Sequence, residues 1–462
     1  MSRLTLFLVF IVLVAENPTM WAGKQFTDMH TPLGVLWDYF FDTTALKFPV
    51  FFFVVVALLI ATELKKSKDP PAAPMRRAVL IAVGSLLSWA VLGLARGGDF
   101  KQIPWQIFNP VCYLLFGLVL MNTIKTVAHV EQLGKVILAA SVWRALCGVV
   151  YYVFVVRNIT NYLKVPPFMT THDDSTLFVT GIVIVFANLI HRPTRKYLML
   201  SPFILGIILY AIQVNNRRLA WASLVGAIVA MYFMLRPSKA RRRVNRIAFV
   251  VAPLIAIYVA VGWGRSERIF KPLKSLSSMD AKQDASTASR EAENDGLIVT
   301  FGQGYFTGTG WGHKYIEVNN TYRLDGIFDQ WAYIPHNSLL GVLAFMGVLG
   351  FAGAWLPLPM SVFLNARSYK ASIKPIEQTA AMVGVAEVII YANQMYGDMG
   401  FASATSLVLL MSAYASAARI SVATQGWPSR KKAPSSADGS KAPAPGTSAP
   451  VEGELARGVK VG

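Results

Sequence analysis

Cysteine is almost absent from this chain of 462 residues, and charged residues are scarce. The two cysteines, Cys112 and Cys147, both stand in apolar stretches. The chain therefore has no disulfide framework and no cysteine spacing for zinc. Only 15% of the residues are charged. No Walker loop, dinucleotide fingerprint or zinc motif is present, so we expect neither a metal nor a cofactor.

What the chain has in abundance is apolar sequence. Hydrophobic residues make up 54% of it, and the mean hydropathy is +0.45. Apolar runs recur, many near the roughly 20 residues that cross a hydrocarbon core. We predict an all-α polytopic membrane protein with about twelve transmembrane helices. The expected spans are 3–15, 49–63, 78–95, 105–124, 134–156, 175–190, 197–213, 219–235, 247–263, 337–356, 376–396 and 401–418.

The first run is short and could instead be the core of a signal peptide. Glu16-Asn17-Pro18 follows it, however, and no small-x-small cleavage site is evident. We interpret it as a short spanning helix.

The net charge of +19 predicts topology rather than a nucleic-acid partner. The bases cluster in the loops after spans two, six, eight and ten, which share one side if every segment crosses once. The positive-inside rule makes that side cytoplasmic and places both termini there. The clustered bases are Lys65, Lys66, Lys68, Arg76, Arg77, Arg192, Arg195, Lys196, Arg236, Lys239, Arg241, Arg242, Arg243, Arg246, Arg367, Lys370 and Lys374.

The largest loop on the opposite side covers about 264–335, between spans nine and ten. It holds eight Lys and Arg against nine Asp and Glu. This nearly neutral, aromatic-containing loop indicates a folded cap. We expect residues 1–426 to form the membrane domain. Residues 427–462, rich in Pro, Ala, Ser and Gly, are expected to be a disordered cytoplasmic tail.

Several cationic side chains are expected on that outer side. Arg217 and Arg218 lie between spans seven and eight, and Arg290 lies in the large loop. His336 stands where the loop meets a span. Each has an ordinary interpretation: interfacial snorkelling for the arginine pair, a solvated loop arginine, and an interfacial histidine. Together they favour a site for an anionic lipid, since guanidinium groups bind diphosphate oxygens bidentately. The imidazole could accept a proton from an attacking hydroxyl.

These residues carry a family resemblance. His336-Asn337, nine residues and then Gly347-x-x-Gly350 resemble the signature of the O-antigen ligase superfamily, which includes related polymerases and protein O-oligosaccharyltransferases. Asn216-Arg217-Arg218-Leu219-Ala220-Trp221 is similar to the family's arginine before a membrane helix. Ser289-Arg290 and the later Gly308-x-Gly310-x-Gly312 resemble its loop arginine and glycine-rich stretch. By its own context, that stretch predicts tight turns rather than a nucleotide site.

The resemblance implies a GT-C-like glycosyltransferase of the bacterial inner membrane that needs no metal. Its donor would be an undecaprenyl-diphosphate-linked glycan. Arg218 and Arg290 would hold the diphosphate, with Arg217 as the competing choice for the first arginine, and His336 would activate the acceptor hydroxyl. A lipid A–core acceptor, membrane lipid and proteins of envelope polysaccharide assembly are the expected partners.

Other polar groups are assigned smaller roles. His172-Asp173-Asp174 precedes span six and could contact sugar hydroxyls, although helix capping by Asp174 is the preferred interpretation. Arg144 and Glu387 lie inside predicted spans, where structural pairing is expected.

Three other functions remain open. A repeat-unit polymerase of the same superfamily would differ chiefly in its acceptor. A transporter of lipid-linked sugars would also have about twelve spans, but it would place its polar groups at midplane. The third is a non-catalytic scaffold of an envelope assembly. The single large loop beside the histidine motif favours a ligase, whereas the near-neutral charge of that loop argues mildly against an anionic lipid A–core acceptor.

Overall fold

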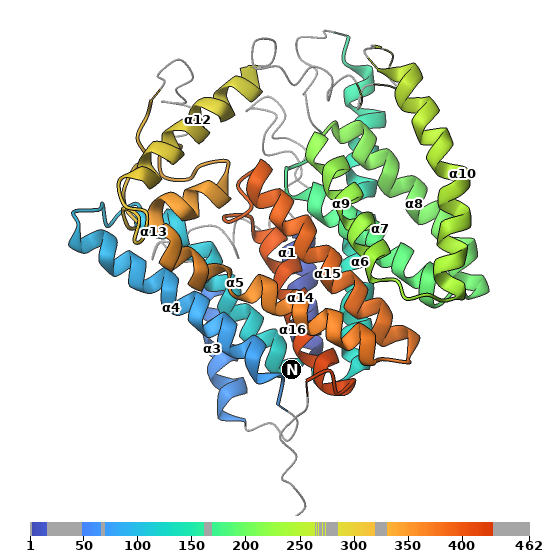
Figure 1. Ribbon diagram of the computed structural model, residues 1–462, viewed down its shortest axis with the longest axis horizontal. Helices are drawn as coiled ribbons and strands as arrows, with labels where there is room; N and C mark the ends of the chain where they lie inside the picture. The colour runs from blue at the N-terminus through green and yellow to red at the C-terminus, as the bar shows by residue number, and fades with distance from the viewer. Residues whose placement is uncertain are drawn as a thin grey trace, which may run out of the picture.

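The computed structural model describes residues 2–15, 49–65, 70–160, 169–263, 265, 267, 270, 273, 285–318 and 330–427. Figure 1 shows a bundle of helices throughout this part of the chain. The segment 16–48, most of 264–284 and the predicted tail from 428 onward lie outside the described residues, so the predictions for them stay predictions.

Each of the twelve predicted apolar ranges coincides with a helix. The helices are α1 (Ser2–Ala15), α3 (Val50–Leu64), α4 (Ala73–Ala95), α5 (Ile103–Thr123), α6 (Val127–Phe154), α7 (Asp174–His191), α8 (Arg195–Asn215), α9 (Arg218–Met234), α10 (Lys239–Gly262), α13 (Ser338–Trp355), α15 (Pro375–Gly397) and α16 (Ala404–Ala423). Three further helical elements are η1 (Val156–Asn158), α12 (Ala285–Gly302) and α14 (Pro357–Ala371).

The described part of the chain holds 8 helical segments that are long and apolar enough to cross a membrane. They are α4, α5, α6 with η1, α7, α8, α10, α13 with α14, and α16. The shorter apolar helices α1, α3 and α9 add to them, and α15 does not belong to either set. The chain is thus an all-α polytopic membrane protein, while the number of twelve spans stays a prediction.

The bundle has a buried centre and an apolar exterior. The apolar window of α16 is 89% buried, whereas that of α10 is 0% buried. Phe249 and Ile255 on α10 face outward, and this helix forms one flank of the molecule (Figure 1). An apolar surface of this kind is stable against lipid tails but not in water.

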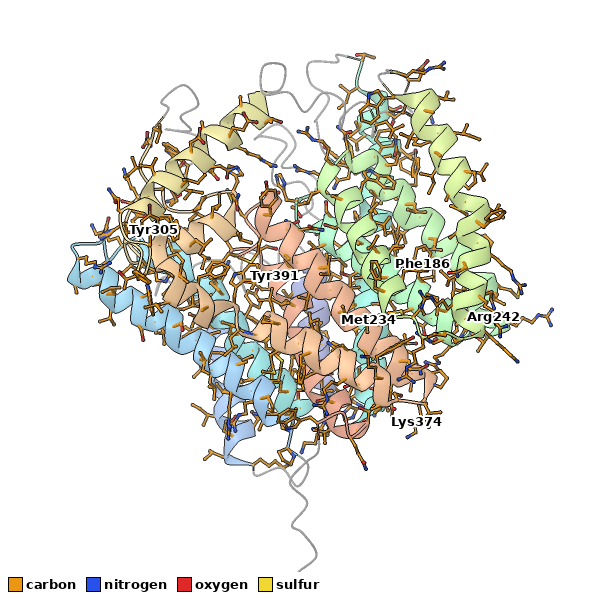
Figure 2. All side chains as sticks on the ribbon, in the orientation of Figure 1. Phe186, Met234, Arg242, Tyr305, Lys374 and Tyr391 are labelled. Carbon is orange, nitrogen blue, oxygen red and sulfur yellow. The ribbon has the colours of Figure 1, made fainter. Side chains whose placement is uncertain are left out.

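The basic loops gather at one end of the helices. Arg192 pairs with Glu131 of α6 at 3.0 Å, and Arg236 after α9 donates to the carbonyl of Tyr369 on α14. Figure 2 shows Arg242 and Lys374 on the lower right of the molecule. This arrangement is the one that the alternate-loop prediction requires.

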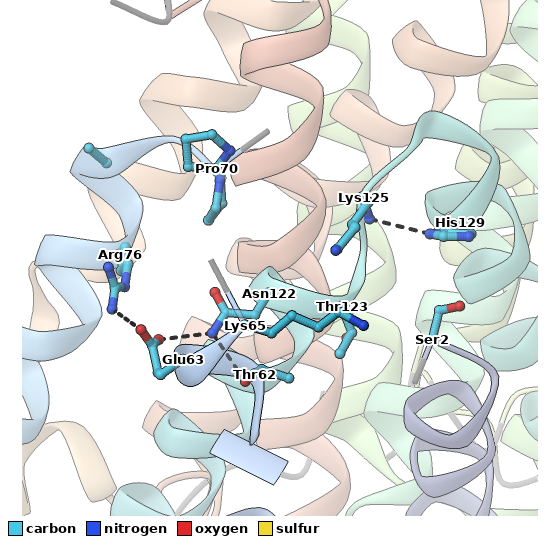
Figure 3. Close-up of a pocket in the computed structure, with 12 residues that line it drawn as sticks. Ser2, Thr62, Glu63, Lys65, Pro70, Arg76, Asn122, Thr123, Lys125 and His129 are labelled. Carbon is cyan, nitrogen blue, oxygen red and sulfur yellow. Dashed lines mark hydrogen bonds and ion pairs between the residues drawn. The ribbon is translucent and has the colours of Figure 1, made fainter. Parts of the chain in front are cut away.

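A polar hollow of about 620 Å³ lies at the same end (Figure 3). Glu63 at the end of α3 accepts from Arg76 of α4 at 2.7 Å and from Asn122 of α5 at 2.9 Å. Lys65 and Lys125 also line the hollow. Because these bonds join three helices, they fix the spacing of α3, α4 and α5.

At the other end, α13 is broken and a loop enters the break. Gly347 leaves the helical conformation with φ 60°. The backbone N–H groups of Val348 and Leu349 donate to the carbonyls of Tyr305 and Phe306. The backbone N–H groups of Thr309 and Gly310 donate in turn to the carbonyls of Ala344 and Phe345. The loop therefore satisfies the backbone groups that the broken helix leaves open, as a membrane interior requires.

Glycines allow this close approach. Gly308, Gly310 and Gly312 all have positive φ, which confirms the predicted tight turns. A Cβ at Gly308 would come within 2.5–2.6 Å of the backbone at Phe345 and Gly347. The Gly308-x-Gly310-x-Gly312 stretch therefore packs against the break at Gly347. We call this contact the joint between the loop and the broken helix.

Candidate functional site

His336 lies just before α13 and is held by Glu293 of α12. Its Nδ1 is 2.9 Å from Oε2 of Glu293. The other carboxylate oxygen accepts from the backbone N–H of Asn337 at 3.1 Å. Asn337 also caps α13, since its side chain accepts from Leu340. One carboxylate therefore fixes both the imidazole and the start of the helix.

This contact sets the chemistry of the imidazole. An imidazole that donates its Nδ1 proton to a carboxylate leaves Nε2 as the basic nitrogen. Burial lowers the pKa of His336, but the hydrogen bond and negative charge of Glu293 raise it by more, so that the pKa lies above its ordinary value. His336 is thus a strengthened base, and its side chain is 23% exposed.

The loop that carries His336 is tied to two further elements. Gln106 of α5 donates to the carbonyl of Tyr333 at 3.0 Å and accepts from the backbone N–H of Gly312. The backbone N–H of Tyr315 donates to the carbonyl of Ala332. The loop in the break of α13 and the segment before His336 therefore form one packed unit.

Arg290 lies on α12, one turn before Glu293, and its charge reaches four groups. It lowers the pKa of His336, His172, Arg217 and Asp398. Such couplings require short distances through poorly screened surroundings. Arg290 thus shares one electrostatic environment with groups from four places: His336 before α13, His172 before α7, Arg217 before α9 and Asp398 after α15.

Arg217 is the buried member of the arginine pair. Asn216 ends α8 in the left-handed conformation, and Arg217 precedes α9 with only 7% of its surface exposed. Burial lowers the pKa of Arg217 to about 10, and the charge of Arg290 contributes in the same direction, opposed by Asp398. Its guanidinium remains charged near neutral pH. Arg218 begins α9 and is half-buried.

His172 and Asp398 form a contact that the sequence did not predict. Nδ1 of His172 meets a carboxylate oxygen of Asp398 at the end of α15. Burial raises the pKa of Asp398, but the bond to His172 lowers it by more, to about 2. Burial lowers the pKa of His172, so near neutral pH a neutral imidazole donates to a carboxylate.

The prediction for Asp174 needs correction. Its carboxylate pairs bidentately with Arg144, at 2.7 Å to Nε and 2.9 Å to Nη2. Both side chains are 1% exposed. Asp173, not Asp174, is the N-cap of α7, without a side-chain cap bond. Asp174 therefore neither caps the helix nor presents its carboxylate to a sugar, because it neutralises a buried arginine.

Two acidic residues of this cluster, Glu293 and Asp398, were missed by sequence reasoning. A weak signal existed for each. Glu293 follows Arg290 by three residues, which is one turn of a helix, and Asp398 ends a predicted span on the expected outer side. Nothing in the sequence pairs either one with a histidine.

One family comparison matches a region that contains some of these groups, but not His172 or Asp398. Residues 203–354 match the family model described as O-antigen ligase. No curated protein matches the chain. The matched range includes Arg217, Arg290, Glu293 and His336, and it indicates a membrane enzyme of glycosyl transfer, of the ligase or polymerase type, that uses a lipid-linked glycan and an acceptor. This match supports membership of the O-antigen ligase superfamily.

Proposed function

We propose that this protein transfers a glycan from undecaprenyl diphosphate to an acceptor hydroxyl at the periplasmic face of the inner membrane. The proposal is supported by the contact of His336 with Glu293 and by the charge of Arg290, which lowers the pKa of both His336 and Arg217. A base beside two permanent cations is what an attack on a sugar diphosphate needs.

The proposed reaction begins with proton removal. Nε2 of His336 takes the proton of the acceptor hydroxyl while its oxygen attacks the anomeric carbon of the donor sugar. The bond between that carbon and the diphosphate oxygen breaks, and undecaprenyl diphosphate leaves with the electron pair. Arg290 and Arg217 stabilise the charge that develops on the leaving oxygens. Glu293 stabilises the imidazolium that forms.

Arg217 is the better choice for the first diphosphate arginine. It is more buried than Arg218, and the pKa of Arg217 responds to the charge of Arg290. Two like charges held together in a poorly solvated place are costly unless an anion joins them. The negative charges of Asp398, Asp173 and Asp174 provide compensation, and a diphosphate would add to it.

We assign the acceptor as lipid A–core, which makes the protein an O-antigen ligase. The support is the single large outer loop beside the His-Asn-x9-Gly-x-x-Gly motif. A repeat-unit polymerase is the second candidate, since the near-neutral loop is a poor match for a strongly anionic lipid A–core. His172 and Asp173 are proposed as neighbours of the bound glycan.

The glycan profile of a deletion strain separates these candidates. A ligase mutant should keep long glycan on the lipid carrier and lack it on lipid A–core. A strain without any long lipid-linked polymer would establish the polymerase instead. If purified protein in proteoliposomes moves the lipid-linked sugar without forming a glycosidic bond, the protein is a transporter and the proposal is wrong.

A further inference from the structure

A second polar site lies inside the bundle and opens at the end opposite His336. A crevice of about 500 Å³ runs between α6, α7, α8, α15 and α16. Charged side chains surround its mouth: Lys135 and Arg192 pair with Glu131, and Lys196 is exposed beside them. Because the Lys135 side chain is 65% exposed, the mouth is in contact with water.

One face of α15 leads from the mouth to the inner end. Ile376, Thr379, Val383 and Glu387 line the crevice on successive turns. From Ile376 to Glu387 the helix rises by about 16 Å. Glu387 is 2% exposed and therefore lies deep in the membrane domain.

The hydrogen bonds around Glu387 favour one protonation state. The hydroxyl oxygen of Thr180 lies 2.7 Å from the carbonyl of Thr176 and 2.5 Å from Oε2 of Glu387. A threonine hydroxyl has a single proton, and a carbonyl can only accept. One proton shared between two acceptors satisfies neither of them fully. A protonated Glu387 would supply the missing proton by donating to the oxygen of Thr180.

The second oxygen of Glu387 is free. Oε1 has no hydrogen-bond partner in the described part of the chain, and the residue lines the crevice. Apart from Glu387, the charged residues that line the crevice belong to its mouth. The uncharged polar lining comprises Thr180, Asn188, Ser201, Thr379, Ser412 and Ser416, and of these Thr180 contacts Glu387. No cation among these lining residues compensates a carboxylate there, so the neutral acid is the stable form.

We propose that Glu387 is a proton-binding site, separate from the glycan-transfer site and reached through this crevice. In the orientation proposed above, the proton comes from the cytoplasmic side. Bound, the proton would let Glu387 donate to Thr180 in the contact between α15 and α7. Asp398 follows α15 and His172 precedes α7, so the same two helices position the contact between these residues.

Labelling with dicyclohexylcarbodiimide tests the protonation state. This reagent adds to protonated carboxyl groups in apolar surroundings, and the adduct is located by peptide mass spectrometry on the purified full-length protein. We expect an adduct at Glu387 that is lost in Glu387→Gln. The matched control is Glu377, a buried carboxyl of the same helix that accepts from Ser372 at 2.7 Å and has Lys374 nearby. Glu377→Gln should leave the adduct unchanged.

An unlabelled Glu387, or an adduct that survives in Glu387→Gln, would overturn the proposal. Because both variants keep shape and are neutral, they should fold, and gel filtration checks this. Glycan transfer is measured separately and is not needed for the labelling result.

The direction of access has its own test. In a chain whose two native cysteines are replaced by alanine, Ser416→Cys lines the crevice, whereas Ala417→Cys is buried outside it. A membrane-impermeant maleimide should label Ser416→Cys from the same side as the marker Lys196→Cys, and should not label Ala417→Cys. Labelling of Ser416→Cys from the other side only, or no labelling while Lys196→Cys reacts, would refute access through the mouth.

Discussion

Glu293 and His336 are 43 residues apart in sequence and meet at 2.9 Å. The same carboxylate also binds the backbone N–H of Asn337. The contact joins α12 of the large loop to the start of α13, so the histidine is oriented by an element outside its own segment. The histidine motif alone does not contain the group that tunes it.

The first prediction concerns this carboxylate. Glu293→Gln keeps the shape but removes the negative charge that raises the pKa of His336. A base works in its unprotonated form, so activity rises as pH passes upward through that pKa. Removing the charge lowers the pKa, and the acid limb of the kcat/KM profile should move to lower pH. The maximal rate should also fall, because a weaker base remains.

The control is Glu291→Gln, which removes an exposed carboxylate of the same helix. Its profile should match that of the unmodified protein. An acid limb that stays in place in Glu293→Gln would show that His336 is not the base whose titration limits the rate.

The second prediction concerns the base itself. His336→Ala should reduce the rate of glycan transfer by about 10²–10⁴-fold, the usual contribution of a general base. Binding of the lipid-linked donor should persist, because the proposed diphosphate contacts are the arginines. Single-turnover transfer and donor binding are measured on the same preparation. Full activity at normal protein levels would contradict the mechanism and favour a scaffold.

The third prediction separates the two adjacent arginines. Arg217→Lys and Arg290→Lys keep a positive charge but lose the bidentate fork, so transfer should fall sharply. Arg218→Lys is the matched control on the neighbouring residue and should retain most of the activity. The measurement is initial rate against donor concentration. A larger loss in Arg218→Lys than in Arg217→Lys would reverse the assignment.

Much of the fold could be predicted from the sequence because lipid imposes a simple rule. Every backbone group must be paired inside the segment, so apolar runs become helices. Even the weakest run, 3–15, is a helix in the structure. The break at Gly347 was not predicted, since the run 337–356 is apolar throughout. It depends on a partner loop about 40 residues earlier.

The site could be predicted only in part, for a similar reason. Arginines on the expected outer side are visible in the sequence because they oppose the positive-inside tendency, and the histidine is visible at the expected membrane boundary. Their carboxylate partners are not visible, because acidic residues such as Glu293 are ordinary in a polar loop. For Arg144 the sequence predicted a structural pairing, which the structure confirms. Its partner was not predicted, because Asp174 at the start of a helix suggests a cap and only the tertiary fold reveals the buried ion pair.

The fourth prediction concerns topology. A reporter that is active only in the cytoplasm, fused after Ser278 in the large loop, should be inactive, and a fusion after Lys374 should be active. Ser278 lies outside the described residues, so this test is independent of the structure. An active fusion at Ser278 would place the loop, and the site with it, on the cytoplasmic side.

The last prediction concerns the joint between the loop and the broken helix. Gly347 has φ 60°, and a Cβ there would come within 2.4–2.5 Å of the backbone at Phe306 and Gly308. Gly347→Ala therefore adds a backbone clash to a positive-φ conformation (ψ −174°) that already costs roughly 1–3 kcal/mol for other residues. Two controls separate these effects. Gly97→Ala has φ 86° but open space around the Cβ, so it carries the conformational cost alone. Gly206→Ala lies in α8 with nothing within 4 Å, and should stabilise by about 0.5–1 kcal/mol.

In thermal unfolding of the detergent-solubilised protein at one scan rate, we expect the apparent Tm to decrease in the order Gly206→Ala, Gly97→Ala, Gly347→Ala. Because the joint packs against the segment before His336, Gly347→Ala should also lose transfer activity below its transition. An apparent Tm for Gly347→Ala at or above that of Gly97→Ala would mean that the loop does not occupy the break.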